Sequence, residues 1–259
     1  MATFASYDQG TPSYIELVTP DQKAAAAFYG PLFGWSFDST DMPDGGVYVQ
    51  SKIEGDTVAG ISGQMPGLEG HPAYWGVYLT VDDIDAAAAA VTAAGGVVEA
   101  EPFDVMTAGR MAAIKDPSGA RVNLWQAGES IGSERANEPG TLVWNELVSP
   151  DLPKALAFYG QVLGMGAAEQ DMGGSSYFVV KNATGRDIGG AMGPMMEGIP
   201  PHWNVYFQVT DVDATIAAAQ AAGGTVVAPA FDVAGVGRLG FLQDPQGAMF
   251  NVMSPSAAA

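Results

Sequence analysis

The chain contains no cysteine, which excludes disulfide bonds, thiolate metal sites and cysteine nucleophiles. It has only two histidines, His71 and His202, so few sites can be built from imidazole ligands. No apolar run approaches the roughly 20 residues needed to span a bilayer, and the N-terminus lacks a basic segment followed by an apolar one. We therefore expect a cytoplasmic protein with no membrane role.

Positive charge is also scarce, with 10 lysines and arginines against 29 acidic residues and a formal net charge of −19. A field of that sign repels phosphate backbones and anionic lipid surfaces, so nucleic-acid partners are not expected. We predict a small-molecule ligand as the partner of this chain, acting as a monomer or a homodimer.

An internal duplication organises the 259 residues. The stretch Gly109–Trp125 (GRMAAIKDPSGARVNLW) recurs as Gly237–Met253 (GRLGFLQDPQGAMFNVM), with the same Asp-Pro turn and the same asparagine. Each copy reads as two strands joined by a tight turn, because proline presets φ and the following glycine permits a positive φ. Duplication at this length predicts repeated structural units.

The wider pattern predicts an α+β fold made of four β-α-β-β-β units. In the first unit a strand over Ser13–Thr19 precedes a helix capped by Asp21 and ended near Gly34. The predicted boundaries are a loose N-terminal arm over residues 1–12 and a first domain over 10–127 (units 12–66 and 70–127), then a polar linker over 128–140 and a second domain over 141–255 (units 141–196 and 199–255).

Several of these motifs together resemble the vicinal oxygen chelate superfamily of glyoxalases, bleomycin-resistance proteins and extradiol dioxygenases. They are Thr19-Pro20-Asp21 after the first strand, Phe33-Gly34-Trp35 at the helix exit, Val81-Asp82-Asp83 before the second helix, and the Asp116-Pro117 turn leading into Asn123. Both halves carry the set, as in two-domain actinobacterial glyoxalase-like members. The resemblance implies that the paired units of each domain curl their sheet around a cavity, with helices on the outer face.

The resemblance also locates the family's metal ligands, which are usually His, Glu or Gln on the opening and closing strands. In this chain those positions hold Tyr14, Gly76 and Asn123 in the first domain and Trp144, Asn204 and Asn251 in the second. The remaining position, near Ser62 and Ala191, stays open. Tyr, Trp, Gly and neutral amides bind divalent cations poorly, so we predict no metal and no other cofactor.

Strand alternation predicts which side chains line each cavity. Trp75, Val77 and Leu79 are expected to face the outer helices instead. The predicted ligand-binding residues are Tyr14, Tyr78, Asn123 and Trp125 in the first domain, and Trp144, Asn204, Tyr206, Asn251 and Met253 in the second.

Glu16 and Glu146 are the sharpest catalytic candidates. A carboxylate in an apolar strand needs solvent or hydrogen bonds, and burial raises its pKa toward the range of a general base. Antiparallel opening strands would bring Glu146 toward His202, a pair suited to acid–base work, and Glu16 toward Tyr74, a pair suited mainly to binding. The alternative is that each glutamate accepts hydrogen bonds and only braces the sheet.

Arg110 and Arg238 occupy equivalent repeat positions after a glycine. They are candidates to bind a carboxylate on a ligand. The alternative is a structural salt bridge, to Asp104 and Asp232 or to Asp116 and Asp244.

Three functions therefore stay open at the level of sequence. The first is a metal-free binding protein for a hydrophobic or aromatic metabolite or drug. The second is a metal-independent lyase, isomerase or hydrolase that uses a cavity glutamate with Tyr74 or His202. The third is a scaffold whose cavities are filled by their own side chains.

Overall fold

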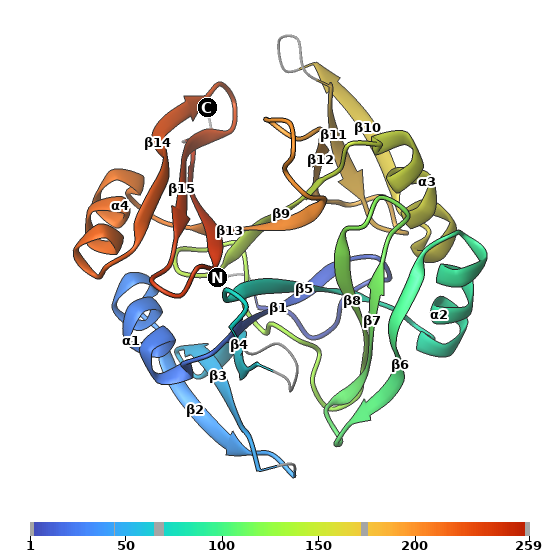
Figure 1. Cartoon of the computed structure of the whole chain (residues 1–259), viewed down its shortest axis with the longest axis horizontal. Helices are drawn as coiled ribbons and strands as arrows, with labels where there is room; N and C mark the ends of the chain where they lie inside the picture. Colours follow the sequence, from blue (N-terminus) through green and yellow to red (C-terminus); the bar gives the residue numbers. More distant parts are fainter. Residues whose placement is uncertain (1–2, 44, 65–69, 172–175, 257–259) are drawn as a thin grey trace.

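The computed structural model describes residues 3–43, 45–64, 70–171 and 176–256. Four β-α-β-β-β units follow one another, as the repeats predict (Figure 1). The first two units comprise β1 (Pro12–Thr19), α1 (Gln22–Phe33), β2 (Ser36–Asp41), β3 (Val47–Ile53), β4 (Asp56–Gly63), β5 (Tyr74–Thr80), α2 (Ile84–Ala93), β6 (Val97–Val105), β7 (Gly109–Lys115) and β8 (Arg121–Ala127).

The second half repeats this order. Its elements are β9 (Leu142–Val148), α3 (Leu152–Leu163), β10 (Gly166–Asp171), β11 (Ser176–Lys181), β12 (Asp187–Met192), β13 (His202–Gln208), α4 (Val212–Ala221), β14 (Thr225–Val233), β15 (Gly237–Gln243) and β16 (Met249–Pro255). Among the described residues, none of the helices is long and apolar enough to cross a membrane.

Each half forms its own eight-stranded mixed sheet. The strand orders are β2-β3-β4-β1-β5-β8-β7-β6 and β10-β11-β12-β9-β13-β16-β15-β14. The two units of a half join through their antiparallel opening strands, which place Glu16 opposite Gly76 and Glu146 opposite Asn204. Each curled sheet is therefore built within one half of the chain, and its concave inner face is called a cup below: the first cup for β1–β8, the second for β9–β16.

Helix ends follow the local sequence. Asp21 accepts a hydrogen bond from the Ala24 N–H at the start of α1. Gly34 ends that helix in the left-handed region, at φ 73°. Glycine adopts this conformation at little cost, which explains its place at the helix exit.

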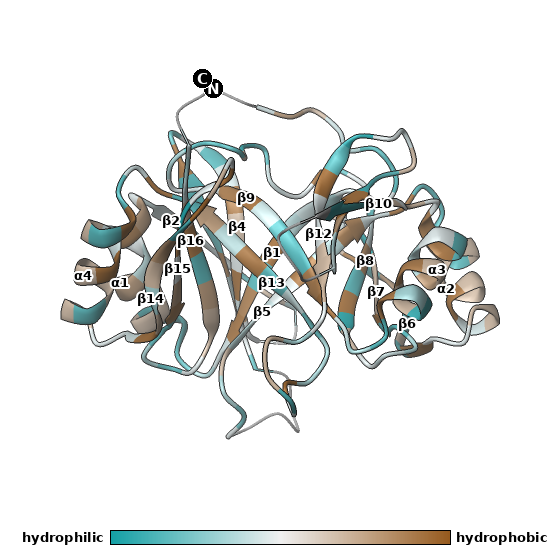
Figure 2. Cartoon of the chain, turned by 90° about the horizontal axis from the view of Figure 1, so that it is seen from above, coloured by the Kyte–Doolittle hydropathy of each residue, from teal (hydrophilic) through white to brown (hydrophobic). Residues whose placement is uncertain are grey.

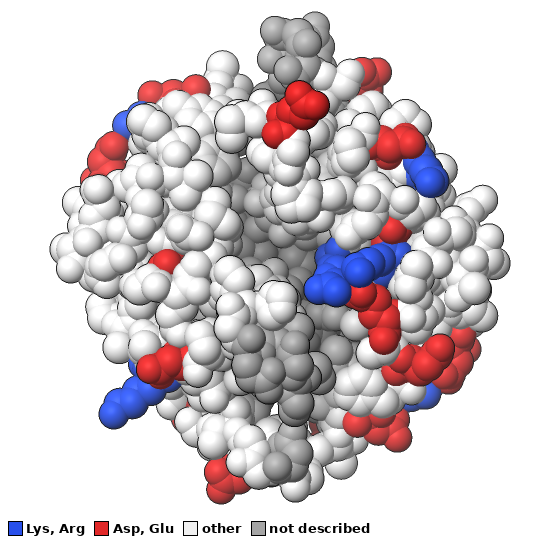
Figure 3. Space-filling model, in the orientation of Figure 1, with Lys and Arg blue, Asp and Glu red and all other residues white. Residues whose placement is uncertain are grey.

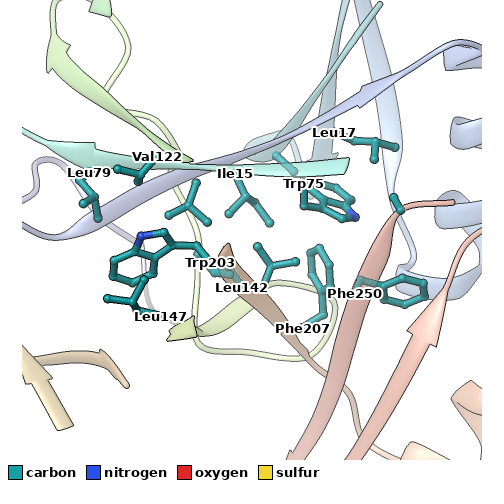
Figure 4. Close-up of a cluster of buried hydrophobic side chains, with 14 of the residues drawn as sticks. Ile15, Leu17, Trp75, Leu79, Val122, Leu142, Leu147, Trp203, Phe207 and Phe250 are labelled. Carbon is teal, nitrogen blue, oxygen red and sulfur yellow. The ribbon is translucent and has the colours of Figure 1, made fainter. Parts of the chain in front are cut away.

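The main core lies between the backs of the two sheets. Figure 4 shows Ile15 of β1 facing Leu142 and Trp203 of the second sheet, and Trp75 of β5 facing Phe207. Two large apolar surfaces thus cover each other, a strong stabilising term.

The prediction that Trp75, Val77 and Leu79 face outer helices is correct only in part. The Trp75 ring lies 5.3 Å from Tyr29 of α1 but also 5.2 Å from Phe207 of the other sheet. Figure 4 places Leu79 in the same central cluster, and Val77 belongs to the same core. The helices lie in pairs at the two ends of the molecule, α1 with α4 and α2 with α3 (Figure 2). The other sheet therefore also contacts these side chains.

Reciprocal hydrogen bonds join the two halves at the Asp-Pro turns. Tyr29 of α1 donates to Asp244 at 2.9 Å, and Tyr159 of α3 donates to Asp116 at 3.2 Å. The other oxygen of Asp116 accepts backbone N–H groups of its own turn, including that of Gly119. Each turn therefore closes a hairpin and also receives the helix of the other half.

The N-terminal arm and the linker are both packed, which corrects the prediction of a loose arm. The Phe4 N–H donates to the Glu134 carbonyl, and Tyr7 donates to the Ser133 carbonyl at 2.6 Å. In the linker the Arg135 side chain is buried and forms ion pairs with Asp56 and two other carboxylates. Arg135, one of the few cations of this chain, therefore holds the linker on the first sheet.

Candidate functional site

The floor of the first cup contains Glu16 within a cluster of hydroxyl groups. Tyr48 of β3 donates to one carboxylate oxygen at 2.9 Å, and Ser62 of β4 donates to the other at 2.7 Å. The nearby Tyr78 hydroxyl also acts to lower the pKa of this carboxyl. The Tyr14 and Tyr48 hydroxyls are 2.9 Å apart, and because Tyr48 donates to Glu16, Tyr14 donates to Tyr48.

The second cup repeats this arrangement around Glu146. Tyr206 donates to the carboxylate at 3.0 Å, and the nearby Tyr177 and Asn204 side chains act to lower the pKa of this carboxyl. Trp144 donates through its indole N–H to the Tyr177 hydroxyl at 3.0 Å, in the position that Tyr14 holds in the first cup. Both cups thus contain a ring that donates to a phenol and a phenol that donates to the carboxylate; Tyr48 has both roles in the first cup, whereas Tyr177 and Tyr206 divide them in the second.

Burial governs the ionisation of both clusters. It raises the pKa of Glu16 and of Glu146 above the usual carboxyl value, although their hydrogen bonds act in the opposite direction. Burial and the neighbouring carboxylate together raise the pKa of Tyr78 and of Tyr206 well above the usual phenol value. The phenols are therefore hydrogen-bond donors at neutral pH.

Asn204 stands between the two members of the predicted Glu146–His202 pair. His202 Nε2 lies 3.1 Å from Asn204 Oδ1, and its Nδ1 lies 2.8 Å from the Pro200 carbonyl. The register explains this, because His202 lies opposite Val148 while Asn204 lies opposite Glu146. The hydrogen-bond partners of His202 are therefore Asn204 and Pro200, and the predicted direct pair with Glu146 does not form.

The corresponding first-cup pairing also differs from the prediction. Tyr74 lies opposite Val18 and is 44% exposed, at the mouth of the cup. Tyr48, which sequence reasoning missed, contacts Glu16 instead. Tyr48 and Tyr177 occupy equivalent positions, four residues before Lys52 and Lys181. Alignment of the two repeats could therefore have identified these tyrosines as a matched pair.

Two glycines make room for these clusters. A Cβ atom at Gly60 would lie 2.1 Å from the Tyr48 hydroxyl, and one at Gly190 would lie 2.0 Å from the Tyr177 hydroxyl. Glycine on β4 and on β12 is therefore what lets a phenol reach each carboxylate. In the strand register Gly60 lies opposite Glu16, and Gly190 lies opposite Glu146.

The residues at the family's metal positions do not fit a divalent cation. The first cup offers Tyr14, Gly76 and Asn123, and a Cβ at Gly76 would lie 3.3 Å from the Asn123 amide nitrogen. No group of three or more His, Asp or Glu side chains in a metal-binding arrangement occurs among the described residues. Phenols and amides are weak ligands beside a single carboxylate.

The register also settles the position left open near Ser62. Ser62 lies opposite Val18 in the first sheet, and Met192 lies opposite Val148 in the second. The counterpart of Ser62 is therefore Met192, and not Ala191.

The remaining predicted lining residues follow strand alternation. Tyr78 pairs with Asn123 and Tyr206 with Asn251, on neighbouring parallel strands of each sheet. The Tyr78 ring lies 6.3 Å from that of Trp125. Met253 packs with Tyr206 in an apolar cluster separate from the main core.

Arg110 and Arg238 do not line the cups, which corrects their assignment as ligand-binding residues. Arg110 alternates with Met111, so it points to the helix side of the sheet, where it pairs with Asp85 of α2 at 2.6 Å and with Asp104. Arg238 pairs with Asp213 of α4 and with Asp232 in the same way. The structure thus has the structural salt bridge that was the alternative prediction. Its partners include Asp104 and Asp232, as expected, but not Asp116 or Asp244 of the Asp-Pro turns.

The walls of the two cups carry different chemistry. The wall formed by β6–β8 presents Glu99, Lys115 and Arg121, and both cations pair with Glu99. On the face shown in Figure 3, a group of basic side chains lies over β7 and β8, beside a hollow near the centre. The equivalent positions on β14–β16 are uncharged: Val227, Gln243 and Met249.

His71 lies away from both cups. It lines a shallow hollow of about 550 Å³ at the junction of the two halves, together with Pro20, Pro72 and Asp244. His71 and His202 therefore do not form a common site.

Sequence comparison agrees with this architecture. The family model described as Glyoxalase/Bleomycin resistance protein/Dioxygenase superfamily matches residues 11–124 and 141–252. The chain belongs to this superfamily, with two tandem glyoxalase domains.

Two curated relatives cover nearly the whole chain. A protein named "Putative glyoxylase CFP32" from Mycobacterium tuberculosis is 46% identical over 254 residues, covering 97% of each chain. The anthracycline biosynthesis protein DauV from Streptomyces sp. strain C5 is 36% identical over 261 residues, covering 94% of this chain and 93% of that protein.

Solved structures share the fold at lower identity. The Mn(II)-bound glyoxalase from Novosphingobium aromaticivorans matches with a TM-score of 0.66 and 20% identity, covering 96% of this chain and 83% of that chain. A variant of homoprotocatechuate 2,3-dioxygenase from B. fuscum matches with a TM-score of 0.67 and 16% identity, covering 97% and 73%.

Proposed function

We propose that this chain is a small-molecule-binding protein of the glyoxalase superfamily that holds an organic ligand in its cups without a metal. The observation that carries the proposal is the pair of clusters around Glu16 and Glu146. Each presents a carboxylate and several phenols on the inner face of a sheet, where a ligand hydroxyl or carbonyl can exchange hydrogen bonds with them.

The metal-free part of the proposal rests on donor chemistry. Each cup has one glutamate at its floor, already hydrogen-bonded to Tyr48 and Ser62 or to Tyr206. Relatives with the same fold include a Mn(II)-bound glyoxalase, but this chain has Tyr, Gly and Asn at the positions of the family ligands. Ligand recognition here depends on hydrogen bonds and aromatic contacts.

A second candidate, favoured by the His202–Asn204–Glu146 arrangement, is metal-independent acid–base catalysis in the second cup. Asn204 contacts His202 and lies opposite Glu146 in the strand register, and burial raises the pKa of Glu146. A carboxyl with a raised pKa is suited to accept a proton near neutral pH. The names of the curated relatives, a glyoxylase and a biosynthesis protein, agree with small-molecule chemistry.

Native mass spectrometry of the protein purified from its host tests the binding function. We expect an added mass from an organic ligand that is lost on denaturation and is reduced in Glu16→Gln or Glu146→Gln. Arg110→Ala is the matched control, since Arg110 faces the helix side, and it should retain the ligand. A chain that carries no ligand, and that binds none from a metabolite extract, contradicts the proposal.

A further inference from the structure

The second cup has an apolar cluster of its own, separate from the main core. Tyr206, Leu239 and Met253 form its buried part, and Phe241 and Trp144 pack against it. A small apolar cluster on the inner face of a sheet does not cover the helices or the other half. It instead lines the concave side, beside Glu146.

A stacked ring pair extends this cluster toward solvent. Phe231 of β14 and Phe241 of β15 lie 5.6 Å apart with an interplanar angle of 14°. Phe231 is 37% exposed, and Val227 and Met249 on the same wall are 50% and 45% exposed. Exposed aromatic and aliphatic side chains in a concave wall are typical of a ligand-binding surface.

The ring pair is connected to the polar floor of the cup. The Phe241 ring lies 6.3 Å from the Tyr206 ring, and Tyr206 donates to Glu146. A flat molecule that packs on Phe241 can therefore reach the Glu146 cluster with one polar substituent. Figure 1 shows β15 and β12 on opposite sides of this cup, and Figure 3 shows the same face hollowed between them.

The first cup lacks this surface at the equivalent positions. Ala113 replaces Phe241, so Phe103, the counterpart of Phe231, has no such ring to stack on. Glu99 and Arg121 replace Val227 and Met249, and they pair with each other at 2.8 Å. An uncharged ring would have to displace hydrated charges there, which is unfavourable.

We propose that the second cup selectively binds an uncharged, planar aromatic molecule that bears a hydroxyl group. The ring packs on Phe231 and Phe241, and the hydroxyl donates to the Glu146 cluster. This inference rests on the proposed function and names the ligand class and the cup.

Calorimetric titration with 2-naphthol, a planar two-ring phenol, tests the inference, with 2-decalol as its saturated, non-planar control. We expect one 2-naphthol per chain and at least tenfold weaker binding of 2-decalol. Phe231→Ala should weaken 2-naphthol binding about tenfold, since ring contacts contribute on the order of one factor of ten. Phe103→Ala, the matched change in the first cup, should have no effect.

Four outcomes overturn the inference. Equal binding of 2-decalol removes the requirement for planarity, and a larger effect of Phe103→Ala assigns the ligand to the first cup while leaving the proposed function intact. A wild-type dimer in sedimentation that Phe231→Ala dissociates assigns the surface to a second copy of the chain. Absence of 2-naphthol binding also contradicts the inference, and the co-purification experiment then decides the proposed function separately. Because Phe231 is partly exposed, its replacement leaves the fold intact, which circular dichroism verifies.

Discussion

The two cups share a floor and differ in their walls. Around Glu16 and Glu146 a phenol donates to a buried carboxylate, and the ring that donates to the neighbouring phenol is Tyr14 in one cup and Trp144 in the other. On the β6–β8 and β14–β16 walls, ion pairs of Glu99 in the first cup give way to uncharged residues in the second. The floor therefore reflects what the repeat preserves, and the walls carry the differences on which the proposed ligand preference of the second cup rests.

The largest expected effect comes from filling the space beside the floor. Gly190→Ala places a methyl group 2.0 Å from the Tyr177 hydroxyl and should displace that ring from Glu146. We expect a loss of about 1–3 kcal/mol in the free energy of unfolding, measured by urea denaturation. Gly60→Ala should behave alike if the floors are equivalent.

Gly193 provides the control for this change, because nothing lies within 4 Å of a Cβ built there. Gly193→Ala should leave the unfolding midpoint nearly unchanged. A tolerated Gly190→Ala, with a midpoint equal to that of the control, would refute the packing of Tyr177 described above.

Reciprocal contacts at the junction offer a second comparison. Tyr159→Phe removes a buried hydroxyl that donates to Asp116 and accepts from the Trp203 indole. Leaving buried partners unsatisfied costs about 1–3 kcal/mol. Tyr29→Phe removes the corresponding hydroxyl, which lies between Asp244 and Trp75, and should cost a similar amount.

A double-mutant cycle of these two substitutions measures the coupling energy between the two contacts. The number of unfolding transitions shows whether the halves unfold together. Nearly additive losses within a single transition agree with two independent contacts across one shared core. Separate transitions for the two halves would contradict a common core.

The pH dependence of stability tests the burial of the glutamate at the floor of each cup. Burial raises the pKa of Glu146 in the folded state above the usual value of 4.5, so the folded chain binds this proton more tightly than the unfolded chain does. The stability that this carboxyl contributes is complete below pH 4.5 and is lost as pH rises through the folded pKa. Glu146→Gln should remove this decline from the unfolding free energy measured between about pH 4 and 8, and Glu16→Gln should act alike.

The smallest effect is expected from the exposed arginines. Arg110→Ala and Arg238→Ala break pairs with Asp85 and Asp213 on the helix side of each sheet. Exposed ion pairs contribute little to stability. Ligand affinity should be unchanged in both variants, and weakening in either would return these residues to the binding site.

Much of this fold could be predicted from periodicity and turns. The aspartate caps, the helix-ending glycines and the Asp-Pro hairpins are local signals, and the structure has them where the sequence places them, as at Asp21 and Gly34. The packing of one sheet on the back of the other was not predicted. It depends on contacts such as Trp75 with Phe207, which are 132 residues apart in sequence (207 − 75) and have no local signature.

The site was predictable at its centre and not at its edges. A glutamate in an apolar strand signals a polar cluster, and both Glu16 and Glu146 have one. The partners were wrong in detail, because Tyr48 and Tyr177 come from a third strand whose register no single-strand pattern fixes. Asn204 was placed on the correct face, but its position between His202 and Glu146 follows only from the strand register.

Calorimetric titration of Mn²⁺ into the chelator-treated protein tests the central claim most directly. If hydrogen-bonding clusters have taken over the floor of each cup, wild type and Glu146→Gln should give the same negligible heat, and the binding of an organic ligand should not change with added Mn²⁺. One tightly bound Mn²⁺ per cup in wild type, lost in Glu16→Gln and Glu146→Gln, would contradict the account.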